Sequence, residues 1–300
     1  MKEHQKAIQL KYLPINEQDA SWGLTTNSVG FQSISRGESY PPRNHPTRYL
    51  FSADRGRVLE EFQLLYIVKG RGTFKSKELK KTEIKEGHMF MLFPAEWHTY
   101  FPCKKTGWDE YWIGFSGKNI KSIVENKFFK TQKPIFNVGI QDDIVSLYKQ
   151  AIRVAIEQKS GYQQMLAGIV NLLLGYAYSY DRFSIFEDLQ VVNQINKAKI
   201  MMAENFNMGI NPKEIAEKVN MSYSWFRRIF KQYTGFAPAQ YIQKIKINKS
   251  KELLTNSNLR IKEIALDVGF SNTECFCTIF KKHTDYTPNE YREFTQGKNL

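Results

Sequence analysis

The feature that most constrains this chain is a motif that occurs twice near its C-terminus. The first copy runs from Ile215 to Tyr241, and the second runs from Ile264 to Tyr291. Four residues recur 49 positions later and five recur 50 positions later, so we expect one inserted residue near the start of the later helix of the second copy. The recurring residues of the first copy are Ile215, Ala216, Val219, Ser222, Phe226, Phe230, Thr234, Pro238 and Tyr241. Such repetition indicates that one supersecondary unit is built twice.

Each copy predicts a helix, a sharp turn and a second helix. In the first copy, Pro212 suits the opening turn of a helix, and apolar residues follow at helical spacing. Asn220 and Met221 form the turn, and Ser222 is a favourable N-cap for the next helix. In the second copy Gly269 takes the turn and Ser271 the cap. Two helices joined in this way form the helix-turn-helix that enters a DNA major groove.

The outer face of each second helix is polar, as direct contact with bases or phosphates requires. Arginine pairs with guanine more often than any other side chain does, whereas lysines near the helix ends suit phosphates. The candidate DNA-binding residues are Ser224, Arg227, Arg228 and Lys231 in the first motif, and Thr273, Glu274, Cys277, Thr278, Lys281 and Lys282 in the second.

At these residues the chain resembles the double helix-turn-helix of the AraC/XylS family of bacterial transcription regulators. The similarity covers roughly the last 110 residues. It is strongest in A-L-D-V-G-F-S at 265–271, F-x-x-x-F-K-K at 276–282 and T-P-N-E-Y-R at 287–292. Asp285 stands where the family has glycine, and aspartate tolerates a left-handed backbone better than most residues. Thr278 stands where the family often has a base-reading arginine.

The charge of the chain agrees with a nucleic-acid partner. The net charge is +13, from 43 Lys and Arg against 30 Asp and Glu. From Gln190 onward there are 17 basic and 10 acidic residues, so the basic excess is denser in the repeat region. The cysteines Cys103, Cys275 and Cys277 form no C-x-x-C pattern, which fits a reducing compartment. With no signal peptide or membrane-spanning run visible, we expect a cytoplasmic protein without a membrane partner.

The N-terminal part has a different character. After a polar stretch at 1–20, expected to be an arm, short segments rich in Val, Ile, Phe and Tyr alternate with Gly and Pro. The predicted strands are 29–34, 60–68, 72–76, 81–85, 89–93 and 108–115, with a turn at Lys69–Gly72, and the prolines of 40–48 exclude a helix there. This spacing is typical of an all-β barrel or sandwich.

Part of this region resembles the cupin barrel that binds effectors in AraC-type sugar regulators. The similarity covers 29–115 and rests on Y-I-V-K-G-R-G-T-F at 66–74 and G-H-M-F-M-L-F-P-A-E-W-H-T-Y at 87–100. Cupin enzymes hold iron or manganese with several histidines. Here the first motif has no histidine and His98 stands alone in the second, so we expect no metal site, no cofactor and no enzyme activity.

The candidate ligand groups are polar or aromatic residues near the predicted strand ends. They are Arg43, His45, Arg57, Glu61, His98, Tyr100, Trp108 and Tyr111. Arginine, carboxylate and histidine hydrogen bonds beside an aromatic ring suit a sugar. The resemblance places Tyr100 and Trp108, and the segment around Arg43, where sugar-type regulators contact their ligand. The aromatic residues and His98 equally suit a packed core.

Two amphipathic helices, 141–158 and 162–180, are expected after the strands, either packing on the barrel or also dimerising the protein. A linker at 181–188, a helix at 189–205 and a long helix at 244–254 follow. We therefore expect an α+β multidomain chain. Its parts are a cupin-like (jelly-roll) barrel with an arm at 1–118, a helical dimerisation segment at 119–184 and an all-α DNA-binding domain at 185–300. The two motifs lie at about 210–232 and 261–283.

Together these features predict a dimeric transcription regulator that binds double-stranded promoter DNA. A small effector, most readily a carbohydrate, would bind in the barrel, and activation would involve RNA polymerase. Two alternatives remain: a cupin-type enzyme fused to a DNA-binding domain, and a ligand-independent regulator whose barrel only dimerises.

Overall fold

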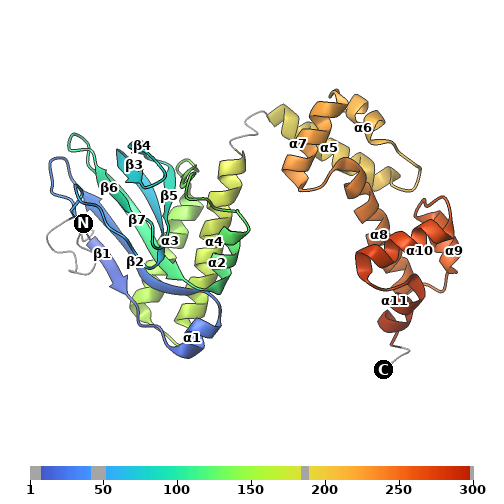
Figure 1. Cartoon of the computed structure of the whole chain (residues 1–300), viewed down its shortest axis with the longest axis horizontal. Coiled ribbons are helices and arrows are strands. Elements are labelled where there is room, and N and C mark those ends of the chain that lie inside the picture. Colours follow the sequence, from blue (N-terminus) through green and yellow to red (C-terminus); the bar gives the residue numbers. More distant parts are fainter. Residues whose placement is uncertain (1–7, 42–51, 184–188, 298–300) are drawn as a thin grey trace, which may run out of the picture. The chain divides into compact units, whose positions relative to one another are not determined.

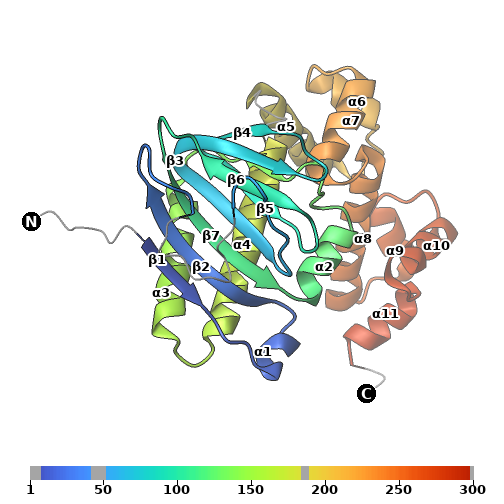
Figure 2. The same cartoon turned by 60° about the vertical axis from the view of Figure 1, so that its left-hand side comes forward.

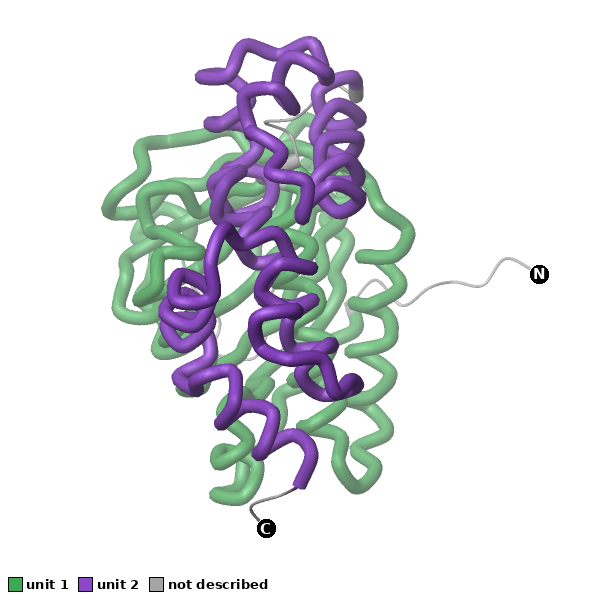
Figure 3. The backbone as a smooth tube through the Cα atoms, turned by 90° about the vertical axis from the view of Figure 1, so that its right-hand side faces the viewer, with its two compact units in different colours: residues 1–185 green, residues 186–300 purple. Residues whose placement is uncertain are grey.

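The computed structural model describes residues 8–41, 52–183 and 189–297. The chain divides into two compact units, unit 1 at residues 1–185 and unit 2 at residues 186–300 (Figure 3). Unit 1 is an antiparallel sheet with helices, whereas the described part of unit 2 contains helices alone. The predicted fold class, a β domain followed by a helical DNA-binding domain, is therefore confirmed.

Eight strands form the sheet within the described part of unit 1. Their order is β1-β2-β7-β3-β5-β8, and β4 and β6 both pair with the C-terminal half of β3. Every pairing is antiparallel. The strands are β1 (Ile8–Tyr12), β2 (Thr25–Ile34), β3 (Phe62–Ser76), β4 (Thr82–Lys85), β5 (His88–Leu92), β6 (His98–Pro102), β7 (Trp108–Ser116) and β8 (Ile135–Asn137).

β3 is continuous through Lys69–Gly72, so the turn predicted there is wrong. Its N-terminal half pairs with β5 and β7, and its C-terminal half pairs with β4 and β6. The register with β7 shifts between Ile67 and Lys69. A Cβ atom on Gly70 would lie 2.3 Å from the carbonyl oxygen of Gly107. The glycine thus permits close backbone approach at a bulge and does not reverse the chain.

Three strands lie outside the predicted set. β1 falls in the stretch expected to be an arm, and it pairs with β2 along its whole length. β6 begins inside the cupin-like motif at 87–100 and runs two residues past it, and β8 pairs with β5 after the last of the predicted strands. β1 reads I-Q-L-K-Y, an apolar–polar alternation too short to distinguish from a coil.

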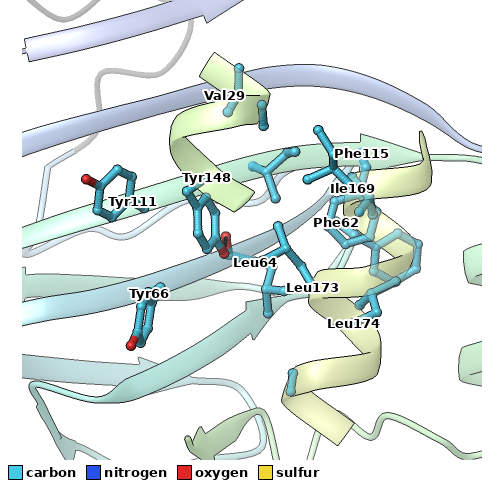
Figure 4. Close-up of a cluster of buried hydrophobic side chains, with 14 of the residues drawn as sticks. Val29, Phe62, Leu64, Tyr66, Tyr111, Phe115, Tyr148, Ile169, Leu173 and Leu174 are labelled. Atoms are coloured by element: carbon cyan, nitrogen blue, oxygen red, sulfur yellow. Dashed lines mark hydrogen bonds between the residues drawn. The ribbon is translucent and has the colours of Figure 1, made fainter. Parts of the chain in front are cut away.

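The period of two along each strand divides unit 1 into two layers. Leu64, Tyr66 and Tyr111 face the helices α3 (Asp142–Glu157) and α4 (Tyr162–Phe183), which cover one face of the sheet (Figures 1 and 2). The ring centroid of Tyr148 on α3 lies 6.2 Å from that of Tyr66 and 5.4 Å from that of Tyr111 (Figure 4). The two predicted helices are confirmed, and their apolar faces pack on the sheet.

The other face of the sheet carries a second, smaller core. Leu65, Ile67 and Phe90 pack there with Trp108 and Trp112. Tyr100 of β6 packs in the same core, so β6 and this face of the sheet lie on either side of it. Two short helices complete unit 1: α1 (Glu17–Ser21) and α2 (Lys118–Glu125).

Unit 2 is built as two small cores joined by one long helix. The first core holds α5 (Leu189–Asn205), α6 (Pro212–Lys218) and α7 (Tyr223–Thr234). The second holds α9 (Ile261–Asp267), α10 (Thr273–Thr284) and α11 (Pro288–Thr295). Helix α8 (Pro238–Asn256) contributes to both cores (Figures 1 and 2). The helix predicted at 189–205 is confirmed, and the connecting helix begins six residues earlier than predicted.

The repeat is explained by equivalent packing in the two cores. Phe226 and Phe230 are fully buried in the first core, and Phe276 and Phe280 are fully buried in the second. Truncating a buried phenylalanine to alanine costs about 3–5 kcal/mol. Each half therefore depends on its own aromatic pair, which is why these residues recur at a spacing of 50.

The caps correct one detail of the repeat. Ser222 is the N-cap of α7, but Asn272 and not Ser271 caps α10, and its side chain accepts a hydrogen bond from the backbone N–H of Cys275 at 2.7 Å. The inserted residue therefore lies in the second turn, before the helix begins. Asp285 adopts φ 65°, which confirms the left-handed backbone expected there.

Within residues 8–41, 52–183 and 189–297, no helix has the length and apolar character needed to cross a bilayer.

Candidate nucleic-acid interface and ligand pocket

The outward face of α7 is exposed and basic. Ser224, Arg227, Arg228 and Lys231 all lie on the surface, while Phe226 points into the core. Because the inward residues fix the rotation of α7, the spacing along the helix sets which side chains face outward. This face can therefore present two guanidinium groups and a hydroxyl group to a groove.

Arg228 is held in place by its neighbour Trp225. The guanidinium carbon lies 4.7 Å from the centroid of the indole ring, which is 39% exposed. A cation over an aromatic face at this distance is attracted by the ring quadrupole. The interaction limits the rotamers of a long side chain, so Arg228 is partly ordered before any partner binds. Trp225 thus orders a cationic side chain on the outward face of α7.

The outward face of α10 has a different chemistry. Glu274 and Thr278 are exposed, and Thr273 and Cys277 are half-buried. The Thr278 hydroxyl donates to the backbone carbonyl of Glu274 at 2.9 Å. Burial raises the pKa of the Cys277 thiol, and the negative charge of Glu274 raises it further. Cys277 therefore presents a neutral thiol. Lys281 and Lys282 are exposed at the end of the helix.

Comparing the repeats position by position shows a functional difference between the motifs. Arg227 and Arg228 of α7 correspond to Cys277 and Thr278 of α10, 50 residues later. Arginine donates to guanine, whereas a methyl group meets thymine and a glutamate accepts from the amino group of cytosine. The two outward faces therefore differ in the donors, acceptors and apolar groups that they carry.

Unit 1 contains a pocket on the face of the sheet opposite α3 and α4. Its walls come from β1, β2, β3, β6 and β7, together with Tyr40, Pro41 and Arg57 from the connecting segments. The remaining wall residues are Tyr12, Gln32, Gln63, Leu65, Tyr100, Glu110 and Trp112. Polar side chains thus converge in an aromatic setting, which is typical of a site for a polar organic ligand.

A buried carboxyl group lies at the centre of the pocket. Glu110 is 1% exposed, and its Oε1 accepts hydrogen bonds from the Gln32 amide and, at 3.0 Å, from the Tyr40 hydroxyl. Burial raises the pKa of Glu110 to about 7, although these hydrogen bonds and the charge of Arg57 oppose the shift. Its other oxygen, Oε2, has no hydrogen-bond partner among the described residues. A donor group of a ligand would complete this site.

Arg57 supplies the opposite charge. Its Nη2 donates to the Tyr100 hydroxyl at 2.8 Å, and its guanidinium carbon lies 5.7 Å from the centroid of that ring. The neighbouring His98 is 2% exposed, and burial together with the Arg57 charge lowers the pKa of its imidazole to about 4. His98 is thus neutral near pH 7, and Arg57 remains the cationic group of the network.

The structure brings together only some of the predicted ligand residues. Arg57 and Tyr100 line the pocket. Trp108 is buried beside it, with its ring centroid 5.8 Å from that of Tyr40. Glu61 immediately precedes β3 and accepts a hydrogen bond from the Gln63 amide at 2.8 Å. His98 lies behind Tyr100, with the two ring centroids 6.2 Å apart.

Tyr111, Arg43 and His45 complete the set. Tyr111 faces the opposite side of the sheet, against Tyr148, because it alternates with Glu110 on β7. It is therefore not in the pocket. Arg43 and His45 lie outside the described residues.

Sequence reasoning missed most of the polar wall. Gln32, Tyr40, Gln63, Glu110 and Trp112 line the pocket but were not among the candidate ligand residues. The alternation of side chains along β7 could have identified two of them, because Glu110 and Trp112 point to one face of the sheet and Tyr111 points to the other. Glu110 is also an acidic residue that shares its face of β7 with Trp108 and Trp112, and a carboxylate between two tryptophans is seldom placed there without a partner.

The pocket is nearly closed. Its cavity volume is about 20 Å³, which corresponds to about one water molecule. A sugar ring is larger, so binding requires Tyr40 or Pro41 to move. Among the described residues no group of three or more His, Cys, Asp and Glu could hold a metal ion.

Comparison with known proteins bears on both sites. Residues 36–174 match the AraC-like ligand binding domain, and residues 215–293 match a helix-turn-helix domain. The chain belongs to the AraC family. The pocket lies in the first match, and α7 and α10 lie in the second. This chain is therefore a DNA-binding transcription regulator with a ligand-binding domain.

Three similar proteins are regulators of bacterial operons. The raffinose operon transcriptional regulatory protein RafR of Pediococcus pentosaceus is 26% identical, covering 79% of this chain and 86% of the relative. The Msm operon regulatory protein of Streptococcus mutans is 24% identical, covering 94% and 97%. The lactose operon transcription activator of Staphylococcus xylosus is 24% identical, covering 78% and 85%. The AraC-family chain described here is thus similar to transcription regulators over most of its length.

Proposed function

We propose that this AraC-family regulator activates transcription in response to a sugar bound in the pocket of unit 1. The observation that carries the proposal is the polar lining around Glu110, in which a buried carboxyl, two amides, three phenols and a guanidinium share one pocket. Sugars present many hydroxyl groups on one side and C–H faces on another. The names of two relatives, for the raffinose and lactose operons, support the same ligand class.

Glu110 and Arg57 have complementary roles in this proposal. A sugar hydroxyl donates to the free lone pairs of Glu110 and favours its ionised form. Arg57 donates to a ring or hydroxyl oxygen, and Trp112 and Tyr100 contact the C–H face. Because the cavity holds about one water molecule, the sugar must displace Tyr40 or Pro41. Tyr40 lies against both Glu110 and Trp108, so its displacement couples ligand entry to the connecting segment.

Thermal unfolding of the full chain with a panel of neutral sugars tests the proposal. Lactose and raffinose come first, since both contain a terminal galactose. We expect a saturable rise in the unfolding temperature of the wild-type protein that is lost in Arg57→Gln and retained in the matched control Arg55→Gln, an exposed neighbour. A flat response to every sugar in the panel would remove sugar from the proposal.

We propose further that Arg227 and Arg228 read guanine bases of a promoter operator. The Arg227→Ala, Arg228→Ala double variant should lose specific retardation of the operator fragment while its unfolding temperature is unchanged, because both residues are exposed. Full specific binding by this variant would exclude them as base-reading residues. DNase footprints with and without sugar, together with transcription assays containing RNA polymerase, would show whether the protein activates.

Dimerisation through α4 is the third part of the proposal. Met165 and Leu172 are 51% and 50% exposed and lie seven residues apart on the outer face of α4. Gly168 and Gly175 lie on the same face, with open space where a Cβ atom would stand. Small residues between large apolar ones allow two helices to approach closely. A ligand that favours one arrangement of a dimer shifts the population of that arrangement.

A further inference from the structure

Unit 2 contains a cavity that adjoins the outward faces of α7 and α10 and is lined by residues of α7, α8 and α10. It is a cleft of about 660 Å³ between α7, α8 and α10, so both halves of the repeat contribute to it. Lys231 enters from α7, Lys244 and Lys251 enter from α8, and Lys282 and His283 enter from α10. We call these five residues the basic cleft.

No carboxylate lines the basic cleft among the described residues, so four ammonium groups face it unopposed. Two of them are held by aromatic rings. The Nζ atom of Lys244 lies 4.5 Å from the centroid of Phe236, and that of Lys251 lies 5.7 Å from the centroid of Tyr291. An aromatic face restrains a lysine without neutralising its charge. The arrangement therefore favours an occupant with several negative charges.

The position of the basic cleft indicates which polyanion it meets. Lys231 lies one helical turn after Arg227 on the outward face of α7, and Lys282 lies one turn after Thr278 on α10. The cleft thus lies between the C-terminal halves of the two reading helices. When two such helices enter successive major grooves, the sugar–phosphate backbone that separates those grooves passes between them.

We propose that the basic cleft binds the phosphodiester backbone of the operator between its two half-sites. This rests on DNA binding by the two motifs. Phosphates carry one negative charge per nucleotide at regular spacing, which suits ammonium groups distributed over three helices. Since the contact is to the backbone, the cleft contributes affinity and fixes the register of both reading helices, but it does not read sequence.

The test compares two double variants of the full chain on operator DNA. The cleft variant is Lys244→Gln with Lys251→Gln, which removes two charges and retains side-chain length. The matched control is Lys249→Gln with Lys262→Gln, which removes two exposed lysines outside the cleft lining. Binding is measured over a range of salt concentrations, and phosphate-ethylation interference is mapped for each protein.

The cleft variant should reduce the slope of log K against log salt by about 2, because each phosphate contact contributes about 0.9 to that slope. Ethylation of phosphates between the half-sites should weaken binding by the wild type and the control, and not by the cleft variant. The ratio of operator to scrambled-site affinity should remain the same in all three proteins.

Three results would overturn the proposal. One is a slope change no larger in the cleft variant than in the control, and another is interference confined to phosphates outside the central region. The third result combines two measurements. Inorganic phosphate alone would raise the unfolding temperature of the wild type saturably but not that of the cleft variant, while the slope of log K against log salt for DNA would be the same in both proteins. That result would assign the cleft to a small free anion. If the wild type itself shows no specific operator binding, DNA reading by the two motifs fails instead.

Discussion

Replacing Glu110 with Gln should change how the stability of unit 1 depends on pH. The pKa of Glu110 is about 7 in the folded chain, against an ordinary value of 4.5. Its contribution to stability is therefore fully present below about pH 4.5 and is lost as pH rises through about 7. At about 1.4 kcal/mol for each pKa unit the full effect is about 3 kcal/mol, of which about 2.5 kcal/mol falls between pH 5 and pH 8.

The wild-type protein alone would conceal this effect. Burial lowers the pKa of His98 from 6.5 to about 4, so its contribution is present above about pH 6.5 and is lost as pH falls. Between pH 5 and pH 8 His98 adds about 2 kcal/mol, which nearly offsets the loss at Glu110. The difference between variant and wild type isolates the carboxyl group, because His98 is present in both proteins.

Urea unfolding at pH 5 and pH 8 measures that difference. Tryptophan fluorescence follows unit 1 once Trp225 of unit 2 is replaced with Phe in every protein compared. The stability of Glu110→Gln relative to the wild type should rise by about 2.5 kcal/mol from pH 5 to pH 8. Glu78→Gln, which removes an exposed carboxylate, is the control and should show no such change. If the difference in stability between Glu110→Gln and the wild type were the same at pH 5 and pH 8, the argument that burial raises the pKa of Glu110 would be refuted.

Three further predictions follow from the two units. Trp225→Ala should weaken operator binding about 2–5-fold, because an exposed cation–π contact contributes about 0.5–1 kcal/mol and Arg228 loses its restraint, as gel retardation beside an Arg228→Ala variant would show. Leu172→Asp should shift the full chain towards monomer in analytical ultracentrifugation, whereas Lys149→Asp on the exposed face of α3 should not. Phe280→Ala should destabilise the second core of unit 2 by about 3–5 kcal/mol, measured by hydrogen exchange of α10 against α7.

Much of unit 2 could be predicted from the sequence because its information is local and duplicated. The helix at 189–205 was placed correctly, and both helix-turn-helix motifs follow from apolar spacing, caps and turn residues. Each signal appears twice, so one copy supports the interpretation of the other. The exception was the cap of α10, where Ser271 and Asn272 are both good caps and only the inserted turn residue decides between them.

Unit 1 was less predictable because its site depends on pairings between distant strands. Glu110 meets Gln32 and Tyr40 only after β2 and β7 pair in a specific register, which no local pattern encodes. Lys69–Gly72 has the composition of a turn, but β3 continues because Gly70 must approach Gly107 closely. Tyr111 was selected for its residue type, whereas the parity of β7 assigns it to the helix face.

Because α8 is shared by two cores, the distance between the reading helices is set by a single rod. Its 19 residues span about 28 Å at 1.5 Å per residue. One extra base pair between the half-sites adds about 3.4 Å and about a tenth of a helical turn. Because α8 is one continuous helix that packs into a core at each end, it cannot bend or rotate to match that change. Operators for this protein should therefore tolerate altered bases far better than altered spacing.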